Sequence, residues 1–372
     1  MKVPISIVSN IFNPTGPAAP GGLEIFNYYL ARELEKRGED VKLFASGDSQ
    51  KLRCLVPLVD KSLQFSKSKE FLFDPWNYRK ITFEEFAIFA KFIEDKSNHN
   101  RVLHFNMDNF LPVYLAAKKG LPMLNTIHLL TKSLGYRILG DLLTEEEMRS
   151  VHFIGVSKRQ VKDFPYNYRV IHHGVDLRDF HYSDNFSNNF IWIGRFVEAK
   201  GCSDAIAAAK KAGEKLEIGG EAKIKNEVEY FESSIKPELN RKIKLKGFVK
   251  QNTRSDFYQA KALIFSSKKD EAFGLTIIEA MACGTPVIAY DRGAASEVIE
   301  GGKTGFIIQP DDVNGLVSAM KKINQLPAKE YLAMRKRCRE NIEKNFSLKI
   351  MADRYLEVYN EIYQDFLSKK SK

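Results

Sequence analysis

The most informative stretch of the chain is residues 270–287, DEAFGLTIIEAMACGTPV. An apolar run before it predicts a buried strand that ends near Phe265, and Gly274 opens a helix. The first N–H groups of that helix, near Leu275 and Thr276, have no partner within the helix, and the positive end of the helix dipole lies behind them. The stretch therefore predicts a strand–loop–helix turn that can hold an anion.

Two carboxylates flank this turn. Glu271 lies just before it and Glu279 lies within the helix, so at 1.5 Å per residue they can be up to about 12 Å apart. That separation suits the reach from a hexose across a diphosphate to a ribose, and carboxylates accept hydrogen bonds from sugar hydroxyls. The pair therefore fits a sugar nucleotide. The alternative is that Glu279 is a solvated helix residue and Glu271 a partner of the helix dipole.

Two cations follow a second predicted strand, Phe190–Ile193. Arg195 comes two residues after it, and Lys200 comes five residues later. Arginine offers a fork to phosphate oxygens, and lysine offers a compact charge. The sequence has no D-x-D pair and only seven scattered His, so we predict no metal site, and these two cations would have to balance a diphosphate. The alternative is a pair of solvated cations beside Glu198.

The first part of the chain offers two further candidates. Gly21 and Gly22 lie in the loop between the first predicted strand and helix, where glycines let a backbone approach a ligand closely. The alternative there is a simple tight turn. His128 follows the predicted strand Met123–Ile127 and would face a cleft between domains, although a lone histidine at a strand end is more often structural.

Strand and helix patterns alternate along the chain, which argues for parallel sheets. A polar segment around residues 167–189 separates two such series and is a plausible hinge. We therefore expect an α/β protein with two Rossmann-like, doubly wound domains facing each other across a cleft, with ligands at the carboxyl ends of the strands. The predicted strands are Val3–Ser9, Val41–Ala45, Val102–Phe105, Met123–Ile127, Phe153–Val156, Phe190–Ile193, Leu216–Ile218, Ile243–Leu245, Ala262–Phe265, Val287–Tyr290 and Gly305–Ile308.

Helical periodicity continues to the end of the chain, but residues 61–101 fit neither pattern. They mix aromatic and basic residues, which we interpret as an irregular insert whose aromatics pack on the first domain. The alternative is a surface that binds an acceptor or touches a membrane. The predicted helices of the second series are Ser203–Ala212, Lys225–Ile235, Thr253–Ala260, Leu275–Cys283 and Asp312–Asn324, with two more between Lys329 and Phe366.

Composition narrows the class of protein. The 372 residues suit two domains, and the ordinary share of hydrophobic residues, 44%, excludes a mainly disordered chain. The net charge of +10 suits an anionic partner. Four cysteines without a C-x-x-C spacing are expected to be lone thiols in a reducing compartment. The short first apolar run, broken by Pro4 and Ser6, argues against an export signal.

Several common functions lack their motif in this sequence. No two glycines are separated by a single residue, so the dinucleotide-binding fingerprint is missing, and neither G-x-S-x-G nor H-E-x-x-H occurs. Gly302-Lys303-Thr304 resembles the end of a phosphate-binding loop, but the first glycine of that motif is replaced by Glu297. No continuous apolar run of about 20 residues predicts a membrane span. A nucleic-acid partner is not expected, because the basic charge is dispersed.

Residues 270–287 resemble the signature of the retaining glycosyltransferases of family 4, which have the GT-B architecture. The resemblance runs from Gly21 to about Ile308 and is thinnest across residues 50–100. It departs from the family where His173 replaces a common Asn, and where Ser266 and Ala272 replace common prolines. The other matching motifs are Gly21-Gly22-Leu23-Glu24, Thr126-Ile127-His128 and Gly194-Arg195 with Lys200-Gly201.

The resemblance implies a role for each matching residue. Glu271 would bind sugar hydroxyls, Glu279 would bind the ribose, and Arg195 with Lys200 would hold the diphosphate. His128 would contact the donor hexose near the reacting carbon. We therefore expect the catalytic residues His128, Arg195, Lys200 and Glu271, and the donor-binding residues Gly21, Gly22, Arg195, Lys200, Glu271, Phe273, Gly274, Leu275, Thr276 and Glu279.

The resemblance also implies an activity and a domain plan. The activity is hexosyl transfer with retention, without metal or cofactor, from a donor such as UDP-glucose, UDP-N-acetylglucosamine or GDP-mannose to a glycan, lipid-linked or small-molecule acceptor. We expect residues 1–170 to bind the acceptor, 171–348 the nucleotide sugar, and 349–372 to form a helix crossing back to the first domain. The expected location is cytoplasmic, with possible contact with the inner membrane face. A nucleotide-sugar epimerase and a non-catalytic binding protein are the alternatives.

Overall fold

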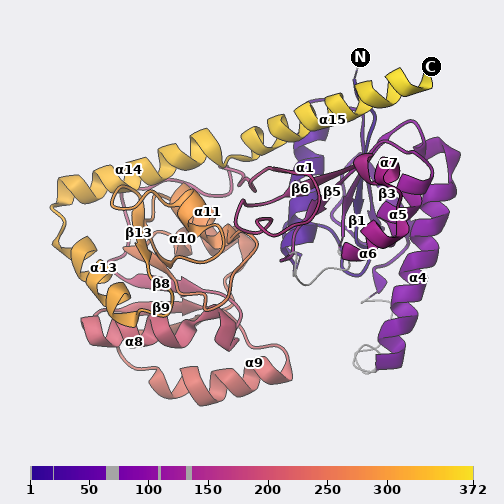
Figure 1. The fold of residues 1–372 in the computed structure, drawn as a ribbon. Coiled ribbons are helices and arrows are strands. Elements are labelled where there is room, and N and C mark those ends of the chain that lie inside the picture. The colour runs from indigo at the N-terminus through magenta and orange to yellow at the C-terminus, as the bar shows by residue number, and fades with distance from the viewer. Residues whose placement is uncertain (1, 20, 64–74, 108–109, 131–135, 372) are drawn as a thin grey trace. The chain divides into compact units, whose positions relative to one another are not determined.

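The computed structural model describes residues 2–19, 21–63, 75–107, 110–130 and 136–371 (Figure 1). The chain divides into two compact units. Unit 1 holds Met1–Val156, Val161–His172 and Met351–Lys372, and unit 2 holds Ser157–Gln160 and His173–Ile350. Apart from the four residues Ser157–Gln160, the chain therefore passes from unit 1 to unit 2 at His172/His173 and returns at Ile350/Met351.

Unit 1 is built on a parallel sheet in the order β3-β2-β1-β4-β5-β6-β7. Buried aromatic and aliphatic side chains form a core beneath its helices, among them Phe89, Phe105 and Phe153. The elements are β1 (Ile5–Ser9), α1 (Gly22–Lys36), β2 (Val41–Ser46), β3 (Leu55–Val59), α4 (Pro75–Glu94), η1 (Lys96–Asn98), β4 (Val102–Asn106), α5 (Leu111–Lys118), β5 (Met123–Ile127), α6 (Arg137–Leu142), α7 (Glu145–Arg149), β6 (Val151–Gly155) and β7 (Tyr168–Val170).

Unit 2 is built on a second parallel sheet, in the order β10-β9-β8-β11-β12-β13. Helices α8 and α13 pack against each other, as do α11 and α14. The elements are β8 (Phe190–Ile193), η3 (Glu198–Lys200), α8 (Cys202–Ala212), β9 (Leu216–Gly219), α9 (Lys225–Tyr230), η4 (Phe231–Ile235), η5 (Lys236–Glu238), β10 (Ile243–Gly247), α10 (Gln251–Phe257), β11 (Ala262–Phe265), α11 (Leu275–Ala282), β12 (Val287–Tyr290), α12 (Ala295–Val298), β13 (Gly305–Ile308), α13 (Val313–Gln325) and α14 (Ala328–Asn345).

Both strand orders reverse direction once, as in doubly wound α/β proteins, which confirms the predicted fold class. The reversal lies between β1 and β4 in unit 1 and between β8 and β11 in unit 2. In open parallel sheets, ligands bind beyond the carboxyl ends of the strands at this point. The loops that follow these four strands are therefore where a site is expected.

The expectation of an irregular insert at residues 61–101 is wrong, because residues 75–94 form the long helix α4. Its inward side chains join the core of unit 1, including Ile81, Phe89 and Phe92. Aromatic residues are weak helix formers and basic residues interrupt the apolar spacing, so packing and not local preference explains this helix. Of the aromatics named for this segment, Phe65, Phe71 and Phe73 lie outside the described residues, as do the side chains of Trp76 and Tyr78.

Two strands were not predicted from the sequence. Strand β3 is an edge strand, half-buried and interrupted by Pro57, and β7 is a short, exposed edge strand with the sequence Tyr-Arg-Val. Neither shows the buried apolar run of a central strand. In unit 2, the predicted helix over Lys225–Ile235 is split into α9 and a π-turn at Phe231–Ile235.

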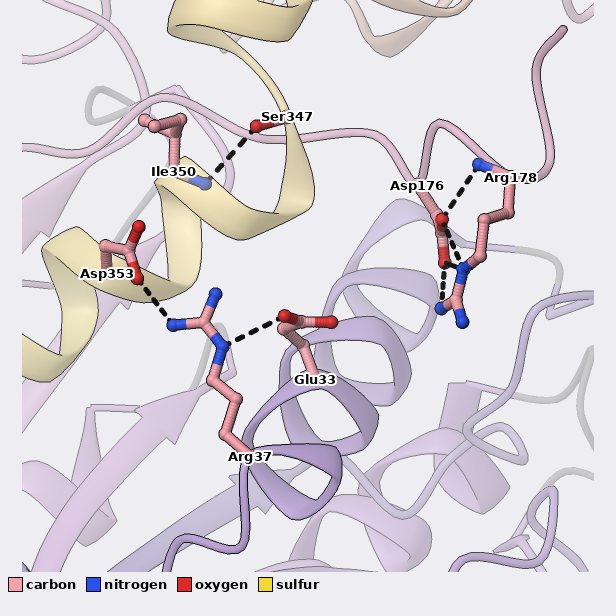
Figure 2. Close-up of polar contacts among 7 residues, drawn as sticks. All are labelled: Glu33, Arg37, Asp176, Arg178, Ser347, Ile350 and Asp353. Atoms are coloured by element: carbon pink, nitrogen blue, oxygen red, sulfur yellow. Dashed lines mark hydrogen bonds and ion pairs between the residues drawn. The ribbon is translucent and has the colours of Figure 1, made fainter.

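The C-terminal helix α15 (Leu348–Lys370) begins in unit 2 and packs within unit 1 from Met351 onward. At its start, the Ser347 hydroxyl accepts the Ile350 N–H at 3.3 Å, as an N-cap does (Figure 2). Within unit 1, the guanidinium of Arg37, the residue that follows α1, donates to Asp353 at 2.5 Å and to Glu33 at 2.9 Å (Figure 2). These contacts fasten the returning helix to α1.

A buried polar network also holds α15 on the sheet of unit 1. The His104 ring on β4 is fully buried, with Nδ1 2.6 Å from the Tyr359 hydroxyl and Nε2 2.8 Å from Thr126 Oγ1. Thr126 Oγ1 in turn lies 3.0 Å from the Tyr355 hydroxyl. Because both tyrosines lie on α15, His104 is a structural residue at the contact between β4, β5 and this helix.

In unit 2, a buried arginine holds helix α14 in place through hydrogen bonds. The Arg335 side chain on α14 is fully buried and donates to the carbonyl oxygens of Ala260, Ser183 and Cys283 at 2.9–3.3 Å. Its guanidinium also lies 4.3 Å from the centroid of the Phe186 ring. All four cysteines are free, and three of them, Cys202, Cys283 and Cys338, are buried.

Candidate functional site

The turn that carries Lys200 is fixed to the loop after β11. Gly201 has φ of 68°, and a Cβ there would lie 1.8 Å from the Ser266 carbonyl oxygen, so only glycine fits. The Ser266 hydroxyl donates to the Gly201 carbonyl at 2.7 Å, and the Lys268 N–H donates to the Ala199 carbonyl at 2.8 Å. The Ser266 side chain therefore links the two loops through a hydrogen bond.

This arrangement brings Lys200 to Glu271. The Lys200 Nζ lies 2.8 Å from Glu271 Oε2. The second oxygen, Glu271 Oε1, is buried and has no hydrogen-bond donor among the residues that the structure describes. A buried carboxylate oxygen without a donor is costly, so this atom is suited to accept a hydroxyl from a ligand. The ammonium has three N–H groups, so it can contact an anion without leaving Glu271.

The second cation is paired differently. Arg195, two residues after β8, donates through Nε to Glu227 Oε1 at 2.7 Å. The Arg195 side chain is 65% exposed and that of Glu227 only 5%, so the guanidinium lies at the surface on a buried carboxylate. Burial alone would raise the pKa of Glu227, but the Lys223 N–H and Arg195 outweigh it, and the net pKa lies below its usual value. Glu227 is therefore a carboxylate at neutral pH.

The anion-binding turn predicted before α11 has an open helix N-terminus. Gly274 precedes the helix with φ of 103°, and no side chain caps it. The Ile277 N–H donates to the Gly274 carbonyl at 3.0 Å, so the helical bonding begins after Leu275 and Thr276. Phe273, the residue before, is buried, and its ring packs edge-on to His173 with the centroids 5.2 Å apart. The backbone of the turn is thus packed on His173 through the buried Phe273 ring, and the N–H groups at the start of the helix have no side-chain cap.

Glu279 lies on α11 but is not a solvated helix residue, so that alternative is wrong. It is 8% exposed, accepts from the Tyr258 hydroxyl at 2.7 Å, and accepts from Arg254 Nη1 at 3.3 Å. Burial, reinforced by Glu279, raises the pKa of Tyr258, so this phenol stays a donor at neutral pH. Each carboxylate oxygen has two lone pairs, so Glu279 retains the capacity to accept a ligand hydroxyl.

The segment that enters unit 2 packs against the end of that unit. A Cβ on Gly174 would lie 2.5 Å from the Ser347 carbonyl oxygen, and the Val175 N–H donates to the Phe346 carbonyl at 2.9 Å. Asp176 and Arg178 form a paired fork with N···O distances of 2.7–3.2 Å (Figure 2). Val175, shortly after the chain enters unit 2, is therefore hydrogen-bonded to Phe346, shortly before it leaves.

Unit 1 carries the remaining candidates. His128 follows β5, and its Nε2 lies 2.8 Å from Asn106 Oδ1 at the end of β4. Because that amide oxygen can only accept, Nε2 carries a proton, and Nδ1 of a neutral ring is the acceptor. The Phe26 ring on α1 lies 4.7 Å from the His128 ring. His128 is thus oriented by neighbours at the carboxyl edge of the sheet.

The Gly21-Gly22 loop is also held by its neighbours. Glu24 is buried and accepts from the side-chain amides of Asn10 and Asn13 at 3.0 and 2.9 Å. A Cβ on Gly21 would lie 2.3 Å from a Glu24 oxygen, so any side chain there would displace the carboxylate. Glu24 therefore packs against the start of α1, and the lack of a side chain at Gly21 favours that packing whether or not a ligand binds.

Sequence reasoning located some of these residues and missed others. In unit 2 the structure pairs Lys200 with Glu271, which precedes the turn before α11, and pairs Arg195 with Glu227, while Gly21, Gly22 and His128 belong to unit 1. The missed partners are Glu227, Arg254, Tyr258 and Asn106, each of which contacts a predicted residue from a different segment. Only Asn106 had a local signal, as a polar residue at the end of a predicted strand.

The described part of the chain contains neither a metal-binding cluster nor a helix suited to span a membrane. No group of three or more His, Cys, Asp or Glu side chains there is arranged to hold a metal ion. None of the described helices has the length and apolar character needed to cross a membrane.

Solved structures share the architecture of both units. A sucrose-phosphate synthase from Thermosynechococcus elongatus has a TM-score of 0.72 at 20% identity, covering 98% of this chain and 100% of that one. The Anabaena protein HepE in complex with UDP and glucose also has a TM-score of 0.72, at 16% identity, covering 96% of this chain and 99% of that one. Two Rossmann-like units of this kind define the GT-B class of glycosyltransferases.

The sequence comparisons specify the family. "Glycosyltransferase Family 4" matches residues 20–179, and "Glycosyl transferases group 1" matches residues 177–345. The chain belongs to the family 4 glycosyltransferases. A lipopolysaccharide core biosynthesis mannosyltransferase of Rhizobium meliloti is 47% identical over 75 residues, which are 19% of this chain and 21% of that protein. The matched stretches span 21%, 25% and 53% of the first three curated relatives.

Proposed function

We propose that this protein transfers a hexosyl unit from a nucleotide-diphosphate sugar, with a UDP-sugar favoured, and retains the anomeric configuration. The observation that carries the proposal is the Lys200–Glu271 pair beside the open N-terminus of α11. A sugar hydroxyl can donate to the Glu271 carboxylate, while the ammonium and the helix end attract phosphate oxygens. Within unit 2 this gives the sugar and the diphosphate adjacent binding groups.

The proposed chemistry needs no protein nucleophile. In a retaining mechanism with same-face attack, the bond from the anomeric carbon to the leaving phosphate oxygen breaks as the acceptor oxygen bonds to that carbon. The leaving diphosphate takes the acceptor's proton. Arg195, Lys200 and the helix end would stabilise the charge that develops on the diphosphate, so the protein contributes positioning and electrostatic stabilisation. Glu279 is proposed to bind the ribose and His128 the hexose.

The donor and acceptor are assigned by class. The HepE structure contains UDP and glucose, which supports a UDP-hexose donor here, and the name of the Rhizobium relative supports a mannosyl donor as the second choice. A glycan, a lipid-linked or a small-molecule acceptor is proposed, taken by residues 1–170, with nucleotide-sugar binding by residues 171–348.

A thermal-shift screen followed by a transfer assay tests the proposed function. UDP-glucose, UDP-N-acetylglucosamine and GDP-mannose are each added to the full chain, and the donor that raises the melting temperature most is incubated with a panel of acceptors. We expect release of the nucleoside diphosphate only with an acceptor, and an α-linked product from these α-linked donors by proton NMR. If none of the three donors stabilises the protein and none is turned over, the proposed activity is refuted. A β-linked product would refute retention.

Chelation gives a separate prediction about charge balance. We expect the transfer rate to be unchanged in excess EDTA, because two protein cations and a helix N-terminus are proposed to balance the leaving diphosphate. The measurement compares initial rates with and without EDTA, and with Mg²⁺ or Mn²⁺ added back. A rate that falls to background with EDTA and returns with either metal would show that a metal ion, and not Arg195 and Lys200 alone, carries this role.

A further inference from the structure

We propose that Glu227 is a positioning residue for Arg195, and that it holds the guanidinium so that its two terminal nitrogens face the diphosphate. The inference rests on the proposed function and adds a residue to that donor site. The Arg195 Nε donates to Glu227 Oε1 at 2.7 Å. Among the described residues, Nε is the one guanidinium nitrogen of Arg195 with a hydrogen-bond or ion-pair partner.

The guanidinium is therefore hydrogen-bonded through Nε, and the edge formed by its two terminal nitrogens is available for a ligand. Arginine carries five N–H groups in a planar fork, and the edge formed by the two terminal nitrogens matches two oxygens of a phosphate. A contact through Nε fixes the plane of the fork without occupying that edge. Because the Arg195 side chain is 65% exposed, the open edge is accessible to a ligand.

Glu227 is itself held in place, as a positioning residue must be. Its second oxygen, Oε2, accepts the Lys223 N–H at 2.9 Å, and its own N–H donates to the Ile224 carbonyl at 3.0 Å. The carboxylate is 5% exposed. A rigid, buried carboxylate under a surface guanidinium reduces the number of rotamers that the arginine samples before a ligand arrives.

The backbone around the pair explains why two segments 32 residues apart meet here. The Gly194 N–H donates to the Gly219 carbonyl at 3.1 Å, and a Cβ on Gly220 would lie 2.5 Å from the Gly194 carbonyl oxygen. The end of β9 therefore packs directly on the residue before Arg195. From there the chain leads through Lys223 into α9, which carries Glu227.

Glu227 also has an effect on binding that opposes pre-ordering. A carboxylate 2.7 Å from the guanidinium partly cancels its charge and repels a diphosphate. The two effects have opposite signs in binding: pre-ordering of Arg195 strengthens it, and charge cancellation weakens it. We infer that pre-ordering dominates, because a long, exposed side chain loses much rotamer freedom when it must be fixed on binding.

A double-mutant cycle with UDP as the probe tests the inference. Calorimetry on the full chain compares the wild type, Glu227→Gln, Arg195→Ala and the double variant. We expect Glu227→Gln to weaken UDP binding about three- to tenfold, as for loss of one pre-ordered side chain. In the Arg195→Ala background, the same change should have no further effect, because Glu227 acts through Arg195. GDP replaces UDP if it binds the wild type more tightly.

The matched control is Glu229→Gln. Glu229 lies on the same helix, is 65% exposed and pairs only loosely with Lys225 at 3.9 Å, so this variant should bind UDP as the wild type does. Arg195→Lys is the second variant, because its surface position should leave folding unaffected. An ammonium cannot contact Glu227 and present a fork, so we expect an affinity close to that of Arg195→Ala.

The outcomes separate the positioning role from the proposed function. Unchanged or tighter UDP binding by Glu227→Gln overturns the inference. It is also overturned if Glu227→Gln lowers the affinity for UDP equally in the wild-type and Arg195→Ala backgrounds, because that result would show a general effect on α9. If Glu227→Gln does not fold, wild-type affinity in Arg195→Lys overturns it. If neither UDP nor GDP binds the wild type, the proposed function fails and the inference fails with it.

Discussion

Replacing Lys200 with alanine is expected to lower kcat/KM for glycosyl transfer about 100- to 1000-fold, comparable to the loss of one donor to a developing oxyanion. The physical reason is that its ammonium is proposed to contact the diphosphate most strongly when negative charge develops on the leaving oxygen. The same substitution removes the partner of Glu271, whose other oxygen already has no donor among the described residues. Both consequences act on the transition state.

The matched control for this variant is Lys269→Ala. Lys269 lies in the same loop system and is exposed, so its removal changes the net charge equally without breaking the pair with Glu271. Steady-state rates of nucleoside diphosphate release, with circular dichroism to check folding, give the comparison. A folded Lys200→Ala variant with wild-type kcat/KM, or a Lys269→Ala variant that loses as much, would contradict the role of Lys200.

Fold prediction from this sequence worked where the local pattern and the tertiary environment agree. Central parallel strands are buried on both faces, so they appear as short continuous apolar runs, and β5, β8, β11 and β12 have the predicted limits. The edge strand β13 also has its predicted limits, because its sequence is a continuous apolar run as well. Strands β3 and β7 lack a buried apolar run, because Pro57 interrupts the half-buried β3 and β7 is short and exposed, so neither was predicted. Helix α4 was not predicted because its apolar face is defined by what it packs on in unit 1, and not by helix-forming residues.

Site prediction followed the same logic. Lys200, Glu271 and the turn before α11 lie in short motifs whose spacing already restricts their geometry. Their partners do not: Glu227 reaches Arg195 from 32 residues away, and Tyr258 reaches Glu279 from 21 residues away. Such contacts depend on the order of strands in the sheet, which one sequence does not specify. Individual site carboxylates can thus be recognised in the sequence, but their hydrogen-bond partners are known only once the structure is known.

The second large effect is expected in the pH dependence of unit 1 stability. Burial lowers the pKa of His104 to about 3, whereas a histidine in an unfolded chain has a pKa of about 6.5. Its folded-state pKa is depressed, so its contribution to stability is fully present above about pH 6.5. Below that pH the unfolded chain binds a proton that the native ring does not, and the contribution is lost as the pH falls toward 3.

The expected size is about 1.4 kcal/mol of unfolding free energy per pH unit in this window, or about 5 kcal/mol over the whole of it. Acid also weakens carboxylate pairs, so the effect of His104 must be isolated by a variant. His104→Gln keeps a hydrogen-bond donor and an acceptor beside Tyr359 and Thr126, but it cannot titrate. The matched control is His181→Gln, because His181 is exposed.

Native-state hydrogen exchange reports this effect within unit 1, which a global unfolding curve of a two-unit protein does not. The free energy of opening for amides of β4 and β5 is measured from pH 7 to pH 4 in the three proteins. We expect it to fall more steeply in the wild type and in His181→Gln than in His104→Gln. The reason is that α15 is held through the neutral His104 ring, so protonation in the open state favours release of the helix from the sheet. Equal slopes in the wild type and His104→Gln would show that His104 titrates alike in both states, and the buried network would then not be the acid-sensitive contact of α15.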